Sequence, residues 1–129
     1  MNDRMTNEER LVQHADDAYE AIRALNHGTY RTIPAPLAYS LLGNLRSLGV
    51  ALSQLADQIG AGLRSSLTKH DVYDDNRDPA ASVEMASEAL KNAADHANDM
   101  AWRFGRAQEA IAWQGYHLPD EDYDDEEGQ

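Results

Sequence analysis

The sequence predicts an all-α protein: a three-helix bundle built on one long antiparallel helical hairpin, followed by a disordered acidic C-terminal tail. Leucine and isoleucine recur at alternating steps of four and three between residues 41 and 59. Small and apolar residues recur in the same way between residues 83 and 111, and a proline precedes each stretch, at Pro36 and Pro79. This spacing places apolar side chains along one side of a helix. We expect one helical domain over residues 1–118 and the tail over residues 119–129.

The first helix is predicted over residues 7–27. Thr6 and Glu9 match a capping box, in which each side chain accepts a hydrogen bond from the other residue's backbone N–H. Gly28 is expected to end the helix in a left-handed conformation. The apolar stripe of this helix follows four-three spacing and consists of Leu11, Ala15, Ala18, Ile22 and Leu25.

The central helix is predicted over residues 36–68, after Pro34 and Pro36. A helix with two adjacent apolar rows and few charges must contact more than one neighbour. Gly49 lies in the second row, where a missing side chain indicates close approach by a neighbouring backbone. The first row is Leu41, Leu45, Leu48, Leu52, Leu55 and Ile59, and the second is Leu42, Gly49, Ala56 and Leu63.

The third helix is predicted over residues 79–115, with Asp78 as its N-terminal cap and Pro79 in its first turn. It matches the central helix in length, so we expect the two to pack antiparallel along the first leucine row, with the shorter first helix over part of them. Its stripe is Val83, Ala86, Leu90, Ala93, Ala97, Met100, Phe104, Ala107 and Ile111.

The net charge of −12 is mostly a property of the tail. Residues 120–129 contain seven acids and no base, and removing these seven charges leaves −5 for the rest of the chain. Like charges at this density repel one another and bury no apolar surface, which predicts disorder. The chain contains no basic cluster, so we expect it to bind neither nucleic acid directly nor an anionic membrane surface.

The absence of cysteine excludes disulfides, thiol catalysis and thiolate metal sites. The sequence contains no apolar run near the roughly 20 residues of a membrane span, and its first residues are polar. We therefore expect a cytoplasmic protein.

The sequence contains no recognisable catalytic or metal-binding pattern. Helix-bundle metal sites use Glu-x-x-His pairs, and none occurs here. Acids and histidines do cluster, at His14 with Asp17 and Glu20 and around His96, but solvated outer faces explain both groups. Serines lack a glycine-rich elbow, and no phosphate loop is present. We expect no enzymatic activity, no cofactor and no metal.

Two tryptophans suggest a partner surface. Trp102 and Trp113 are eleven residues apart, which places them on one side of the predicted third helix, among charged residues. Large aromatic side chains in such settings are enriched in protein interfaces. Coverage by the first helix is the alternative explanation. The candidate interface residues are Trp102, Arg106, Glu109, Trp113 and Tyr116.

The run APLAYSLLGNL at residues 35–45, with Ala110-Ile111 and Gln114-Gly115-Tyr116, resembles small uncharacterised helical proteins of actinobacteria and of their mobile elements or phages. The resemblance implies an intracellular bacterial accessory protein and carries no activity. Trp113-Gln114-Gly115 is also similar to the Trp-x-Gly of the WXG family of helical-hairpin secretion substrates. In that family the motif lies between two helices, whereas here it is expected to end the last one.

These observations favour a non-enzymatic helical adaptor or small regulatory subunit that self-associates. The first helix is too short to cover the whole central helix, so we expect a homodimer in which hairpins pair into a four-helix layer. The alternative is an antitoxin-like acidic inhibitor or nucleic-acid mimic, whose carboxylates occupy a basic site on a protein partner. Salt-sensitive binding through the tail would favour the inhibitor.

Overall fold

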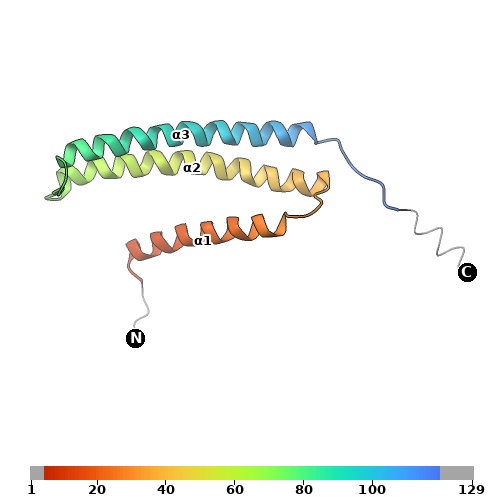
Figure 1. Cartoon of the computed structure of the whole chain (residues 1–129), viewed down its shortest axis with the longest axis horizontal. Helices are drawn as coiled ribbons and strands as arrows, with labels where there is room; N and C mark the ends of the chain where they lie inside the picture. The colour runs from red at the N-terminus through yellow and green to blue at the C-terminus, as the bar shows by residue number, and fades with distance from the viewer. Residues whose placement is uncertain (1–4, 120–129) are drawn as a thin grey trace, which may run out of the picture. The chain divides into compact units, whose positions relative to one another are not determined.

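A computed structural model describes residues 5–119 of the chain, and within them it contains three α-helices (Figure 1). These are α1 (Asn7–Gly28), α2 (Ala35–Lys69) and α3 (Pro79–Ala110). The predicted all-α fold class is confirmed. The helices belong to two compact units, α1 to one and the pair of α2 and α3 to the other, and each unit is described by itself. The predicted acidic tail lies, from residue 120 onward, outside the described residues.

Helix α1 begins as its sequence predicts and ends differently. The N–H of Glu9 donates to Thr6 Oγ1 (3.0 Å) and the N–H of Thr6 donates to Glu9 Oε1 (2.9 Å), which confirms the capping box. The prediction of a left-handed Gly28 is wrong, because no described glycine has a positive φ. Instead, the N–H and hydroxyl of Thr29 both donate to the carbonyl of Leu25, at 2.9 and 2.7 Å, and satisfy the helix end.

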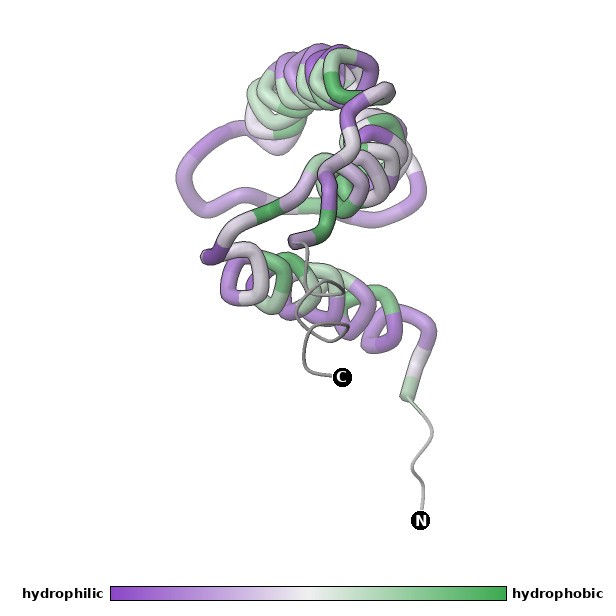
Figure 2. Tube along the Cα trace, turned by 90° about the vertical axis from the view of Figure 1, so that its right-hand side faces the viewer, coloured by the Kyte–Doolittle hydropathy of each residue, from purple (hydrophilic) through white to green (hydrophobic). Residues whose placement is uncertain are grey.

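Leu11 and Leu25 of the apolar stripe of α1 are exposed, Ile22 is half-buried, and no residue of this helix is buried. Hydrophobic and hydrophilic residues alternate along its tube in Figure 2, as in an amphipathic helix. The packing of α1 onto the hairpin stays a prediction.

Helices α2 and α3 lie side by side and antiparallel, which confirms the predicted hairpin (Figure 1). Residues 70–78 join them, and hydrogen bonds within this loop define its shape. The carboxylate of Asp74 accepts hydrogen bonds from the N–H groups of Asn76 and Arg77, both at 2.9 Å. Asp78 caps α3 through a bond from the N–H of Ala81 (3.3 Å), as its position before Pro79 predicts.

The contact between α2 and α3 is made by small residues. A Cβ atom at Gly49 would lie 2.9 Å from the Cβ of Ala101, so only glycine permits the observed approach of the two backbones. This confirms the packing role predicted for Gly49. The buried residues of the hairpin are Gly49, Ser53, Ala56 and Gly60 of α2 and Val83, Ala94 and Ala101 of α3.

The prediction that α2 contacts α3 through its first leucine row is wrong. The contact uses the row of Gly49 and Ala56, and three residues of the leucine row, Leu52, Leu55 and Ile59, are exposed. Two rows that are adjacent on one helix both satisfy a heptad pattern, so periodicity does not decide which of them meets the partner. The row of small residues faces α3 because glycine and alanine let the two backbones approach closely, and close approach favours van der Waals contact between the helices.

Helix α3 is five residues shorter than predicted. It ends at Ala110, and a tightened turn follows in which the N–H of Ile111 donates to the carbonyl of Gln108 (3.3 Å) and that of Gln114 to Ile111 (3.1 Å). Near this end, the side-chain amide of Gln108 donates to the backbone carbonyl of Tyr39 (3.0 Å), which ties the start of α2 to the end of α3.

Candidate interaction surfaces of the hairpin

The first candidate surface is the leucine face, which we define as the first leucine row of α2 with the neighbouring side chains of α3. Leu52, Leu55 and Ile59 are 40%, 49% and 47% exposed. They line an apolar groove of about 310 Å³. None of the described residues that line this groove is charged: they are Leu52, Leu55, Ala56, Ile59, Leu90, Ala93 and Ala97.

The second candidate surface is the tryptophan groove, which has a volume of about 320 Å³. It lies on the other side of the helix contact. Leu48 and Val50 flank Gly49, and successive helical residues are about 100° apart, so these two side chains point to opposite sides of the contact row. The lining residues are Arg46, Val50, Asn98, Ala101, Trp102, Gly105, Arg106 and Glu109.

Two guanidinium groups converge on the tryptophan groove from different helices. The Cζ of Arg106 lies 5.2 Å from the centre of the Trp102 ring, within the range of a cation–π contact. The side chain of Arg46 extends from α2 to Gly105 of α3. A Cβ atom at Gly105 would lie 3.3 Å from Arg46 Cδ and 3.4 Å from Arg46 Nε. Neither arginine forms an ion pair with another described residue, and one carboxylate, that of Glu109, lines the groove.

The structure brings three of the five predicted interface residues together. Trp102, Arg106 and Glu109 line the tryptophan groove, and Trp102 is 58% exposed. Trp113 and Tyr116 follow the end of α3 and do not line it. The expectation that both tryptophans share one side of α3 is therefore wrong, because the helix ends before Trp113, which is 98% exposed in the turn.

Sequence reasoning missed the contribution of Arg46 to this groove. A signal existed: Gly105 lies four residues after Ala101 on the small-residue side of α3, and a glycine there leaves room for a long side chain from the facing helix. Arg46 is also the one charged residue in α2 before Asp57. The antiparallel register that brings Arg46 to Gly105 could be seen only in the tertiary structure.

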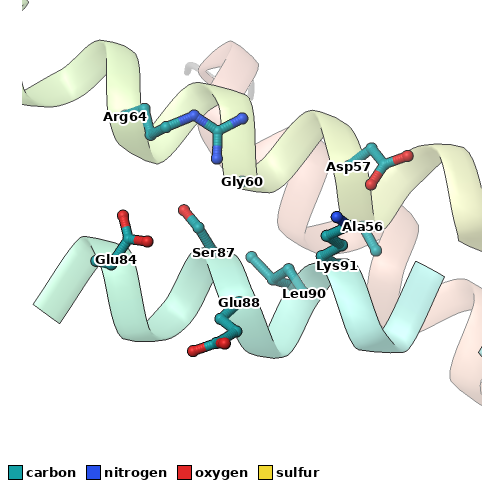
Figure 3. A pocket seen from close by; sticks show the side chains of 9 residues that line it. All are labelled: Ala56, Asp57, Gly60, Arg64, Glu84, Ser87, Glu88, Leu90 and Lys91. Carbon is teal, nitrogen blue, oxygen red and sulfur yellow. The ribbon is translucent and has the colours of Figure 1, made fainter. Parts of the chain in front are cut away.

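A third groove, of about 430 Å³, lies on the same side of the hairpin as the tryptophan groove but nearer the 70–78 loop. Figure 3 shows Ser87 pointing from α3 toward α2, whereas Glu88 points away. Among residues 5–119, the Ser87 hydroxyl is buried without a hydrogen-bond partner and no histidine lines the groove. A serine without a hydrogen-bonded base is not activated as a nucleophile. The other lining residues are Ala56, Asp57, Gly60, Arg64, Glu84, Leu90 and Lys91.

The described residues contain no group of three or more histidines and acids placed to hold a metal ion. Within residues 5–119, no helix combines the length and apolar character needed to cross a membrane.

Comparison with protein-family models, with curated proteins and with solved structures finds no match for this chain. The resemblance to small actinobacterial and phage proteins therefore stays a prediction.

Proposed function

We propose that this chain is a non-enzymatic helical interaction protein, an adaptor or small regulatory subunit, that forms a homodimer through its leucine face. The observation that carries this proposal is the exposure of Leu52, Leu55 and Ile59 beside an uncharged groove. Continuous apolar surface of this kind marks protein interaction sites in soluble proteins.

A second copy of the hairpin suits the leucine face by length. The leucine row occupies residues 41–59 of α2, a helix that has 35 residues and a length of about 52 Å at 1.5 Å per residue. A helix with the 22 residues of α1 could span this row but would leave 13 residues of α2 without a neighbouring helix. A second hairpin has a face of equal length, and two-fold association buries both copies in one four-helix layer.

Light scattering combined with size-exclusion chromatography tests the dimer. We expect a mass of about twice the chain's 14.3 kDa at micromolar concentration. Leu55→Glu should shift the mass toward one chain, because a charge in a dry interface has no compensating partner. Circular dichroism should show that the variant keeps its helices.

Val50→Glu is the matched control. Val50 is 52% exposed, close to the 49% of Leu55, but it lies on the opposite side of the helix contact. We expect this variant to keep the mass of the unmodified protein. A mass of 14.3 kDa for the unmodified chain at every concentration would rule out the homodimer, and a lower melting temperature of Leu55→Glu would then assign the leucine face to the monomer's own core.

The acidic-inhibitor alternative would use carboxylates rather than the leucine face. The loop between α2 and α3 supports this alternative, because it contains four aspartates, of which Asp71, Asp75 and Asp78 are exposed and Asp74 is half-buried. Binding of a basic partner through these groups would weaken as salt rises. A dimer held by leucines would keep its mass in 1 M salt (about 3 Å Debye length), so the same chromatography at two salt concentrations separates the two functions.

A further inference from the structure

The tryptophan groove has features of a binding site for an acidic segment. Its two arginines come from different helices, and neither is neutralised by an ion pair within the described residues. Arg106 stacks over Trp102, so the groove combines positive charge with an aromatic surface. Arginine and tryptophan are the residues that most often dominate binding energy at protein interfaces.

Charge complementarity points to residues 120–129 of the same chain as the occupant. This segment carries seven carboxylates and no base, whereas the groove presents the guanidinium groups of Arg46 and Arg106 against the single carboxylate of Glu109. Guanidinium groups pair well with carboxylates because two N–H groups match two oxygens.

The chain between the groove and this segment is long enough to permit the contact. Trp102 lies eight residues before the end of α3, which is about 12 Å along the helix axis. After the turn at residues 111–114, residues 115–119 span up to about 17 Å when extended. A segment tethered at this distance has an effective concentration in the millimolar range, so contacts that are individually weak suffice to hold it.

We infer that the segment 120–129 docks in the tryptophan groove of its own chain, where its carboxylates pair with Arg46 and Arg106. An acidic partner segment would then bind this groove only by displacing the tail. The groove and the leucine face lie on opposite sides of the hairpin, so this docking is independent of the proposed homodimer.

Trp102 itself supplies the readout, because its ring lines the groove. The test uses the full-length chain with Trp113→Phe, which leaves Trp102 as the one tryptophan. It compares the natural tail with a tail whose seven acids are replaced by Asn or Gln. At low salt we expect the natural tail to shift Trp102 emission to shorter wavelength and to lower its quenching by acrylamide. Both differences should be lost near 1 M salt, where the Debye length is about 3 Å.

Arginine variants localise the effect. Arg46→Gln should abolish the difference between the two tails, and it does so without touching the Arg106–Trp102 contact. Arg64→Gln, which removes a guanidinium from the other polar groove, is the matched control and should preserve the difference. Equal emission and quenching for both tails at low salt would overturn the docking, as would a difference that survives Arg46→Gln. If the difference in emission and quenching between the two tails disappears when the protein is diluted, docking within one chain is also overturned, because the groove would then bind the tail of a second copy.

Discussion

A Cβ atom at Gly49 of α2 would lie 2.9 Å from the Cβ of Ala101 in α3 and 3.2 Å from the carbonyl oxygen of Ala97. Atoms this close must move apart, so the distance between the helices is set by the absence of a side chain at residue 49. This contact determines which side of α2 faces α3 and, as a consequence, which side carries the exposed leucines.

The first prediction follows from this contact. Gly49→Ala should lower the free energy of unfolding by about 1–3 kcal/mol, because the added methyl group overpacks the helix contact. Gly62→Ala is the control in the same helix: a Cβ there meets no atom within 4 Å, so the gain in helix propensity should stabilise the protein by up to about 1 kcal/mol. Urea unfolding measures both. Equal stabilisation by the two substitutions would mean that the helices are further apart than described.

The second prediction separates the helix contact from the leucine face. Leu90 is half-buried, with its Cδ1 3.8 Å from where a Gly60 Cβ would lie, so Leu90→Asp should destabilise the hairpin by several kcal/mol. Leu52→Asp replaces a side chain that is 40% exposed. The sequence pattern predicts that both substitutions unfold the protein, whereas the structure leads us to expect that Leu52→Asp keeps its thermal transition and loses self-association.

Circular dichroism melting and light scattering, run on the same samples, check this pair. Loss of the thermal transition in Leu52→Asp would show that the first leucine row belongs to the folded core of the single chain.

The third prediction concerns the pH dependence of the loop. Hydrogen bonds from the N–H groups of Asn76 and Arg77 hold the pKa of Asp74 below its usual value of 3.8. Because the pKa is lower in the folded state, the ionised carboxylate stabilises the fold above the unfolded pKa, and this stabilisation is lost as the pH falls through the folded pKa. Asp74→Ala should therefore lower the melting temperature at pH 7, and the gap to the unmodified protein should narrow below about pH 3.8.

Melting curves between pH 7 and pH 2 measure this gap, with Asp75→Ala as the control. Asp75 lies in the same loop and accepts no hydrogen bond from a described side chain or backbone amide, so its substitution should have a much smaller effect. A gap for Asp74→Ala that stays constant with pH would show that the loop bonds do not depend on the carboxylate's charge.

The fourth prediction concerns truncation after Pro119. We expect the shortened chain to keep its melting temperature and to remain a dimer. Exposed ion pairs to the tail contribute at most about 1 kcal/mol each to the free energy of unfolding and are screened by salt. Calorimetry and light scattering at physiological salt test this expectation. A fall of several degrees would mean that the tail stabilises the fold by more than exposed ion pairs can.

The amino-acid sequence by itself determined the helices and their beginnings. Thr6 with Glu9 and Asp78 with Pro79 mark two helix starts correctly, since caps act between residues that are neighbours along the chain. The hairpin also follows from the sequence, because two helices of similar length with apolar repeats, joined by a short polar loop, can bury apolar surface against one another by folding back. Helix ends were predicted less accurately: Thr29, and not a left-handed Gly28, caps the end of α1, and α3 ends before Trp113.

Only the tertiary structure decided which row of α2 meets α3. Leu52 and Ala56 belong to adjacent rows with the same seven-residue repeat, and both rows are apolar, so burial alone favours neither. The choice depends on how closely two backbones approach, which is a property of the pair of helices: Gly49 fits against Ala101, and leucine would not. The same register places Arg46 over Gly105 beside Trp102, a juxtaposition of residues from two helices that spacing along one chain does not contain.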